Sequence, residues 1–301
     1  MSIISRVALA GATGNLGPAI VKELVDAGFQ VTVLTRQNST SSKALQASVT
    51  AIPVDYDSLD SLTNALKGQD AVVSTLGSAA MGKQLLLIQA AVKANVKRFI
   101  PSEFGSNTVV EKTARLPIYK DKIAVQNALK EAASSSALSY TLIYNGPFLD
   151  WGIKVGFVID VKNKQINLYD GGDRVFSTTT LPTIGKAVAG VLKNPAQTAN
   201  RPVYIQDTAI TLEKLAALGK KATGDATWKE DIVSVDEMVE QSWVELKSPN
   251  PDPHKFVYGF IKAAIFGEGY GAHYETLDND LLGIKGLSDA EVQDLLNRYA
   301  S

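Results

Sequence analysis

The stretch Val7-Ala8-Leu9-Ala10-Gly11-Ala12-Thr13-Gly14-Asn15-Leu16-Gly17 decides the fold of this chain. It opens with an apolar strand pattern, and three glycines then follow at intervals of three residues. A helical pattern begins at once, with Ile20, Leu24 and Val25. Glycines allow a tight turn and the close approach of a diphosphate, and the following helix offers unpaired N–H groups at its N-terminus. The stretch therefore predicts a dinucleotide cradle rather than an ordinary strand-to-helix turn, although G-x-x-G-x-x-G differs from the simplest fingerprint.

Length and composition indicate a globular protein without a charge bias. The chain has 301 residues, 45% hydrophobic and 20% charged, which suits one large α/β domain with or without a smaller lobe. Its 30 basic and 31 acidic residues give a net charge of −1, so we expect neither nucleic acid nor a membrane as partner. No cysteine is present, which excludes disulfides and cysteine nucleophiles. The first residues lead directly into a strand, so we expect no signal peptide, a cytoplasmic location, and a monomer or homodimer.

Strand and helix patterns alternate through the first half of the chain. The predicted strands are 6–10, 30–36, 49–54, 70–75, 98–101 and 140–144, and the predicted helices are 16–27, 58–66, 83–94 and 117–132. Strands such as the one containing Ala71, Val72 and Val73 are apolar on both faces, as in a parallel sheet covered by helices. We therefore predict an α/β fold over residues 1–150, a doubly wound parallel sheet of the NAD(P)-binding Rossmann type.

The second half is less regular, and we interpret residues 151–301 as a smaller α+β lobe that binds substrate and is partly interleaved with the sheet. Segments 164–169 and 174–178 flank Asp170-Gly171-Gly172-Asp173, which predicts a β-hairpin. Helical patterns follow at 182–192, 211–222, 234–246, 253–266 and 288–300.

The residues after the second predicted strand favour NADP(H) over NAD(H). NAD-specific folds usually place an acidic residue there to bind the ribose 2′-hydroxyl, but none occurs between Asp26 and Asp55. Arg36 ends the strand instead, Lys43 follows, and residues 38–42 are polar. A guanidinium with hydroxyl donors suits a 2′-phosphate. Arg36 alone would fit a solvated surface charge equally well, so the missing acid decides the choice.

Lys122 is the candidate for acid–base chemistry. It follows Ile118 by four residues and precedes Val125 by three, which places it on the apolar face of the predicted helix 117–132. Burial there would lower the pKa of Lys122, as suits a general acid or base. A lysine at a helix edge can also extend to water, and the pattern alone does not separate these alternatives.

Other catalytic patterns are weaker. Tyr258 and Lys262 have the Tyr-x-x-x-Lys spacing of many short-chain dehydrogenases, but they lie far beyond the sheet strands, and we interpret the match as chance. The two histidines, His254 and His273, lack H-x-x-x-H spacing, so no metal site is predicted.

The segment Phe99-Ile100-Pro101-Ser102-Glu103-Phe104-Gly105 resembles the R-F-I-P-S-E-F-G segment of the isoflavone reductase-like group. This group includes pinoresinol–lariciresinol, phenylcoumaran benzylic ether and isoflavone reductases, and it belongs to the NmrA-like atypical short-chain dehydrogenases. The resemblance continues through residues 121–125 and 140–148 and covers nearly the whole chain. It places the catalytic lysine of the family on Lys122.

The resemblance also implies the residues of a cofactor site. They are Gly11, Thr13, Gly14, Asn15, Leu16, Gly17, Arg36, Lys43, Thr75, Leu76, Gly77, Ser102, Glu103, Phe104, Lys122, Asn145, Pro147 and Phe148. The substrate pocket is expected to be formed by Phe104, Phe148, Trp151, Phe260, Tyr270 and His273. Gln126 departs from the arginine that many plant members have at this position, and the C-terminal third is unlike the plant lignan enzymes, so their substrates are not transferred.

These features together predict an NADPH-dependent reductase. The expected reaction is hydride transfer from NADPH, which becomes NADP+, to a small aromatic or conjugated substrate, with Lys122 as general acid or base. Two alternatives stay open. One is a non-catalytic NADP(H)-binding redox sensor, and the other is a redox-neutral isomerase or dehydratase that keeps the cofactor as a scaffold.

Overall fold

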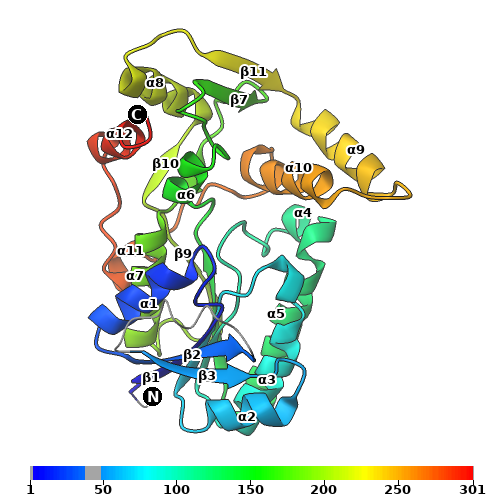
Figure 1. Cartoon of the computed structure of the whole chain (residues 1–301), viewed down its shortest axis with the longest axis vertical. Helices are drawn as coiled ribbons and strands as arrows, with labels where there is room; N and C mark the ends of the chain where they lie inside the picture. Colours follow the sequence, from blue (N-terminus) through cyan, green and yellow to red (C-terminus); the bar gives the residue numbers. More distant parts are fainter. Residues whose placement is uncertain (1–2, 38–48, 301) are drawn as a thin grey trace.

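A seven-stranded parallel sheet forms the larger lobe of the molecule, seen in the lower half of Figure 1. The computed structural model describes residues 3–37 and 49–300. In spatial order the strands are β3 (Thr50–Val54), β2 (Gln30–Arg36), β1 (Arg6–Ala10), β4 (Ala71–Ser74), β5 (Arg98–Ile100), β6 (Ser139–Tyr144) and β9 (Arg201–Tyr204). The strand order reverses beside β1, where ligands bind in Rossmann-like folds. The predicted doubly wound sheet is confirmed.

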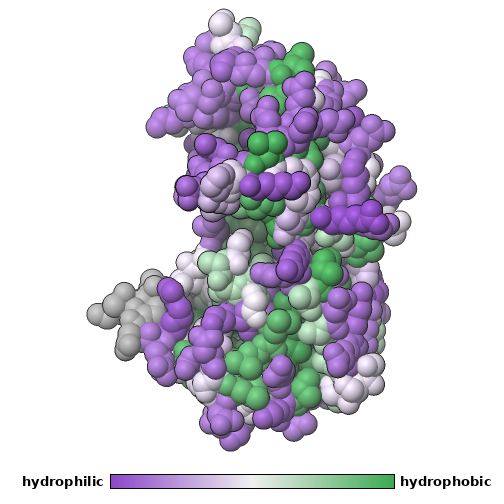
Figure 2. Space-filling model, turned by 90° about the vertical axis from the view of Figure 1, so that its right-hand side faces the viewer, coloured by the Kyte–Doolittle hydropathy of each residue, from purple (hydrophilic) through white to green (hydrophobic). Residues whose placement is uncertain are grey.

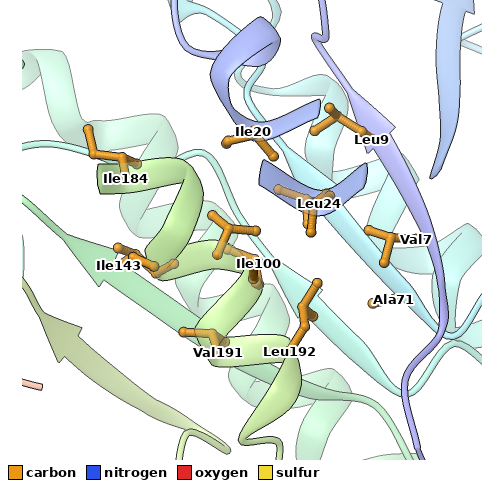
Figure 3. Close-up of a cluster of buried hydrophobic side chains, with 14 of the residues drawn as sticks. Val7, Leu9, Ile20, Leu24, Ala71, Ile100, Ile143, Ile184, Val191 and Leu192 are labelled. Carbon is orange, nitrogen blue, oxygen red and sulfur yellow. The ribbon is translucent and has the colours of Figure 1, made fainter. Parts of the chain in front are cut away.

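Helices cover both faces of this sheet because alternate residues of each central strand point to opposite sides. Val7 and Leu9 belong to a core cluster with α1 (Gly17–Asp26) and α7 (Leu181–Lys193). Ala8 belongs to a second cluster on the other face, which is covered by α2 (Leu59–Leu66), α3 (Lys83–Lys93) and α5 (Lys120–Ser135). Figure 3 shows side chains of the first cluster converging from both helices and the strands: Val7, Leu9, Ile20, Leu24, Ala71, Ile100, Ile143, Ile184, Val191 and Leu192. Each buried aliphatic side chain contributes about 1.5–3 kcal/mol, so this cluster fixes α1 against the sheet.

Two elements from the second half of the chain return to the larger lobe. The strand β9 pairs in parallel with β6, and α7 packs against α1. The sequence analysis does not predict β9, because the strand has four residues, contains Pro202 and buries only Val203. An edge position tolerates the missing N–H of a proline. The division near residue 150 stays a prediction, and these two elements are where the halves interleave.

The smaller lobe holds most of the remaining elements. They are α6 (Leu149–Lys154), β7 (Gln165–Tyr169), β8 (Phe176–Thr178), β10 (Thr208–Ile210), α8 (Leu212–Thr223), β11 (Lys229–Val233), α9 (Val235–Leu246), α10 (Pro253–Phe266) and α12 (Asp289–Asn297). The short helices η2 (Ser78–Ala80), α4 (Glu111–Ala114), η3 (Pro117–Tyr119) and α11 (Asn279–Leu282) complete the described chain. The two ends of the chain lie at opposite ends of the molecule (Figure 1).

The predicted hairpin around residues 170–173 is wrong. The strand β7 pairs in parallel with β11, and β8 pairs antiparallel with β10. Three successive residues, Asp170, Gly171 and Gly172, have positive φ angles of 47°, 97° and 86°. The Asp170 carboxylate also accepts a hydrogen bond of 2.9 Å from the backbone N–H of Val235, just after β11. The turn therefore holds β11 beside β7 and directs β8 elsewhere.

The surface of the molecule is mixed in character. Figure 2 shows one face on which hydrophilic residues dominate the upper part, while hydrophobic residues gather lower down. Within residues 3–37 and 49–300, no helix combines the length and the apolarity needed to cross a bilayer.

Candidate active site

The glycine loop lies at the carboxyl end of β1 and is held by backbone contacts. The N–H of Gly14 donates to the carbonyl of Gly11 at 3.1 Å. The hydroxyl of Thr75, after β4, lies 2.9 Å from that same carbonyl oxygen and supports the loop from the side. A Cβ atom at Gly17 would lie 2.4 Å from the backbone of Ala12, so only glycine lets α1 begin this close to the loop. No side chain caps the first turn of α1. Pro18 has no N–H and the N–H of Ala19 donates to the carbonyl of Leu16, so the N–H of Gly17 is the one left there for a ligand among the described residues.

The glycine-loop cavity is the hollow lined by loop 11–14, the strand ends 33–37 and 54–57, and segment 75–83, with a volume of about 540 Å³. Predicted cofactor residues that line it are Gly11, Thr13, Gly14, Arg36, Thr75, Leu76 and Gly77. Asn15, Leu16 and Gly17 do not line it, because Leu16 belongs to the core beneath the loop and Asn15 points to solvent. Lys43 lies outside the described residues.

The space beside two of these glycines tests whether a dinucleotide fits. A Cβ atom built at Gly77 meets nothing within 4 Å, and one at Gly14 meets only the carbonyl oxygen of Gly11, at 3.5 Å. Protein packing therefore does not explain the absence of side chains at these positions, whereas the close approach of a diphosphate does. Together with the uncapped helix and Arg36, the residues present fit a dinucleotide with an additional phosphate.

Among the polar side chains that line this cavity, Tyr56, Asp57 and Lys83 were not in the predicted site. The Tyr56 hydroxyl donates to the carbonyl of Leu34 at 3.1 Å, and burial raises the pKa of Tyr56 to about 12, so its phenol is neutral at pH 7. Lys83 of α3 forms an ion pair with Asp57 across the cavity mouth. The available signal was position: residues 55–57 directly follow a predicted strand, and strand ends share one edge of the sheet.

The Lys122 cavity is a second hollow of about 270 Å³ that meets the first along residues 77–81. Gly77, Ala79 and Ala80 line the glycine-loop cavity, while Ser78 and Met81 line the Lys122 cavity. The remaining walls are mainly aromatic and aliphatic: Phe104, Ile118, Tyr119, Pro147, Phe148, Trp151, Phe157, Val257, Tyr258, Ile261 and Ile265, with Gly105, Ser106, Asp121, Lys122 and Gly146.

Lys122 reaches this cavity from the first turn of α5, with its side chain 13% exposed. Its Nζ donates to the backbone carbonyl of Glu103 and lies 3.9 Å from Oε2 of the same residue. It also lies 5.6 Å from the centre of the Tyr119 ring. Burial lowers the pKa of Lys122, and the nearby Glu103 carboxylate offsets part of that effect. The amine therefore faces the cavity rather than bulk water.

Besides Asn15, Leu16 and Gly17, three more predicted cofactor residues line neither cavity: Ser102, Glu103 and Asn145. The Ser102 hydroxyl donates to the carbonyl of Leu76 at 2.8 Å and so supports the cavity wall from behind. Glu103 is buried, and its carboxylate faces away from both hollows. Asn145 is also buried, and its Oδ1 accepts no hydrogen bond from the described residues.

The prediction for the C-terminal part of the pocket needs correction at Phe260. Helix α10 does line the Lys122 cavity, but through Val257, Tyr258, Ile261 and Ile265. Phe260 lies on the opposite face of α10, fully buried, with its ring centre 5.1 Å from that of Trp243 in α9. The sequence shows an apolar helix but not which of its faces meets the cavity.

Tyr270 and His273 lie outside the Lys122 cavity as well. The Tyr270 ring lies 4.3 Å from Nζ of Lys112, and His273 is exposed. Of the Tyr-x-x-x-Lys pair only Tyr258 lines the cavity, because Lys262 instead contacts aromatic rings of the smaller lobe. In the part of the chain that the structure describes, no three acidic or histidine side chains gather to hold a metal ion.

Ser106 and Tyr119 are polar lining residues that the sequence analysis missed. The Tyr119 hydroxyl donates to Oγ of Ser106 at 2.9 Å, and burial raises the pKa of Tyr119, which keeps the phenol protonated. Ser106 thus accepts from the protein, and its own hydrogen meets no acceptor among the described residues. Its place just after the segment 99–105 was the one signal for it.

Comparisons with known proteins agree with this geometry. The sequence pattern of the NmrA-like family matches residues 4–241. The chain belongs to the NmrA-like family. It is 32% identical to oxidoreductase poxI of Penicillium oxalicum, over 94% of this chain and 91% of that one. It is 29% identical to phenylcoumaran benzylic ether reductase PT1 of Pinus taeda, over 90% of each chain.

Solved structures extend the likeness of this NmrA-like chain to its fold. The complex of leucoanthocyanidin reductase with NADPH from Vitis vinifera matches with a TM-score of 0.81 and 21% identity, over 98% of this chain and 99% of that one. The predicted resemblance to isoflavone reductase-like proteins is therefore confirmed at the level of family and fold.

Proposed function

We propose that this protein is an NADPH-dependent reductase that transfers a hydride to an electron-poor carbon of a small aromatic or conjugated substrate, such as an enone, a quinone methide or a benzylic ether. One observation carries the proposal. Among the described residues that line the aromatic-walled Lys122 cavity, Lys122 supplies the one amine, and this cavity meets the one that fits a dinucleotide.

The cofactor would be held by backbone rather than by many side chains. The loop at Gly14 and the open position of Gly77 would receive the diphosphate, just before the start of α1. Arg36, and by the resemblance Lys43, would bind the 2′-phosphate. When bound, NADPH supplies a hydride, and therefore two electrons, at the junction of the two cavities.

Lys122 supplies the proton that this reduction requires. As the substrate carbon gains the hydride, a π bond or a carbon–oxygen bond breaks and its electron pair moves to the substrate oxygen. The ammonium of Lys122 donates a proton to that oxygen, and solvent returns one to the amine. A lowered pKa makes the lysine a better acid, and such catalysis contributes about 10²–10⁴-fold to the rate. Phe104, Phe148 and Trp151 exclude water around these charges.

The test combines a substrate panel with matched lysine variants. Purified protein would be assayed for NADPH oxidation with enones, quinones and phenolic benzylic ethers, and NADPH binding would be measured by calorimetry. We expect Lys122→Met to lose about 10²–10⁴-fold in kcat and to keep its NADPH affinity within a few-fold. Lys120→Met, two residues away and exposed, is the control.

Three outcomes would contradict the proposal in different ways. Tight NADPH binding with no turnover on the panel would favour a redox sensor. Conversion of a substrate without net NADPH oxidation would favour a redox-neutral enzyme. A fully active Lys122→Met variant beside an inactive Tyr258→Phe variant would move the acid–base role to α10.

A further inference from the structure

A buried carboxylate lies directly behind Lys122 and belongs to neither cavity. The Glu103 side chain is 1% exposed, and its Oε2 is 3.9 Å from Nζ of Lys122. The next residue, Phe104, has a φ of 30°, a left-handed conformation that a non-glycine residue rarely adopts. The chain thereby turns so that the Phe104 ring lines the cavity while Glu103 is buried behind it.

The neighbours of this carboxylate are arranged as hydrogen-bond donors. The amide of Gln126 donates to Oε1 at 2.9 Å, and the hydroxyl of Thr108 donates to Oε2 at 3.2 Å. Because Thr108 gives its hydrogen to Glu103, the Tyr144 hydroxyl at 2.9 Å must donate to Thr108. Donors that point at a carboxylate favour its charged form, whereas burial raises the pKa of Glu103.

Lys122 is the one cation in the described residues that faces this carboxylate, and two different atoms of Glu103 contact it. The backbone carbonyl accepts from Nζ, and the carboxylate lies beside the same nitrogen. The other ionisable groups around the pair are Tyr119, beside Lys122, Tyr144, beside Thr108, and the exposed Asp121 in the wall of the Lys122 cavity. Burial raises the pKa of both phenols, so they are neutral and leave Glu103 as the only buried counter-charge.

We infer that Glu103 is a positioning residue for Lys122, and that its carboxylate keeps the lysine amine protonated and directed along the cavity wall. The catalytic consequence rests on the proposed function, in which Lys122 exchanges a proton with substrate. The electrostatic link itself does not depend on turnover and is measurable without a substrate.

The central variant is Glu103→Gln, which removes the charge and keeps the shape. The new amide can donate to the Thr108 hydroxyl, which then turns its hydrogen to Tyr144, while the remaining oxygen at position 103 still accepts from Gln126. The matched control is Glu131→Gln, which removes an exposed carboxylate from the same helix at a position that lines neither cavity. Solvent screens a charge at that position.

The measurement is the pKa of Lys122, obtained by carbon-13 methylation of the lysines and NMR titration, with Lys122→Arg to assign the signal. In Glu103→Gln we expect the pKa to fall by about one unit or more, and in Glu131→Gln by less than about 0.3 units. The limb of the pH profile of kcat that reports Lys122 should move to lower pH by the same amount as the pKa. The KM for NADPH should stay unchanged.

Charge and packing are separated by Glu103→Asp, which keeps the charge but shortens the side chain. We expect a smaller fall in the pKa of Lys122 than in Glu103→Gln, and equal falls would mean that packing rather than charge acts on the lysine. An unchanged pKa in folded Glu103→Gln would overturn the inference. Should that variant not fold, Lys122→Met tests the same link from the other side. Loss of the cation should raise the pKa of the Glu103 carboxyl, followed by carbon-13 NMR, and an unchanged value would overturn the inference. If no substrate is turned over at all, the proposed function fails while this titration still stands.

Discussion

The two cavities meet along one short segment but are built in different ways. The glycine-loop cavity is formed within residues 11–83, at the carboxyl ends of neighbouring strands. The Lys122 cavity draws side chains from residue 78 to residue 265, including helix α10 of the smaller lobe. One site is thus local in sequence, and the other exists only after the two lobes have packed.

This difference shows which parts of a site can be predicted from a sequence. A glycine pattern between a strand and a helix specifies backbone geometry, and that geometry forms one wall of the glycine-loop cavity. The Lys122 cavity depends on which face of each helix meets the hollow. Apolar periodicity marks a buried face but does not distinguish a core from a pocket wall.

Adjacent residues of α10 offer the strongest test of this distinction. Phe260→Ala should lower the free energy of unfolding by about 3–5 kcal/mol, because a fully buried ring is lost from the contact with Trp243. Ile261→Ala, which alters the cavity wall, should change the KM for substrate and cost less stability. Urea denaturation and steady-state kinetics measure the two effects. If Phe260→Ala instead changed the KM for substrate and Ile261→Ala cost more stability, Phe260 would be a pocket residue after all.

Much of the larger lobe could be predicted because each element carries its own signal. The strands β1 and β2 have the predicted bounds, since their apolar runs end at a glycine and at a charged residue. The strand β9 is short, contains a proline and carries no apolar run of its own. Its strand conformation comes from pairing with β6, which the local sequence does not reveal. The hairpin failed for a related reason, since the contact between Asp170 and Val235 joins segments 65 residues apart.

The candidate site was predictable to a similar, partial extent. Lys122 was found because a charged residue on an apolar helix face is unusual, and the resemblance then pointed to the same position. The resemblance also put Glu103 among the cofactor residues, but its carboxylate lies behind the cavity with Thr108 and Gln126. A motif identifies the residues that a site needs, but not the direction in which each side chain points.

The backbone character of the glycine-loop cavity can be tested with the same substitution at two glycines. Gly17→Ala should lower the free energy of unfolding by about 3 kcal/mol, because its Cβ would lie 2.4 Å from the backbone of Ala12. Gly14→Ala meets no such obstacle and should keep its stability while losing about tenfold in NADPH affinity, or about 1.4 kcal/mol. Thermal unfolding and calorimetry separate the two. Equal NADPH affinity in Gly14→Ala and the unmodified protein would mean that the diphosphate does not approach this loop.

Ser106 offers the test with the smallest expected effect, and it is specific because Ser106 lines the Lys122 cavity alone. Its hydroxyl accepts from Tyr119 and has its own hydrogen to donate, so Ser106→Ala should raise the KM for an oxygen-bearing substrate about three- to tenfold. The KM for NADPH should not change, since Ser106 does not line the glycine-loop cavity. If Tyr119 acts through Ser106, adding Tyr119→Phe to Ser106→Ala should raise the substrate KM no further. Additive effects on the substrate KM would show that each hydroxyl contacts the substrate by itself. If Ser106→Ala raised the KM for NADPH as much as the KM for substrate, the two cavities would not act as separate binding sites.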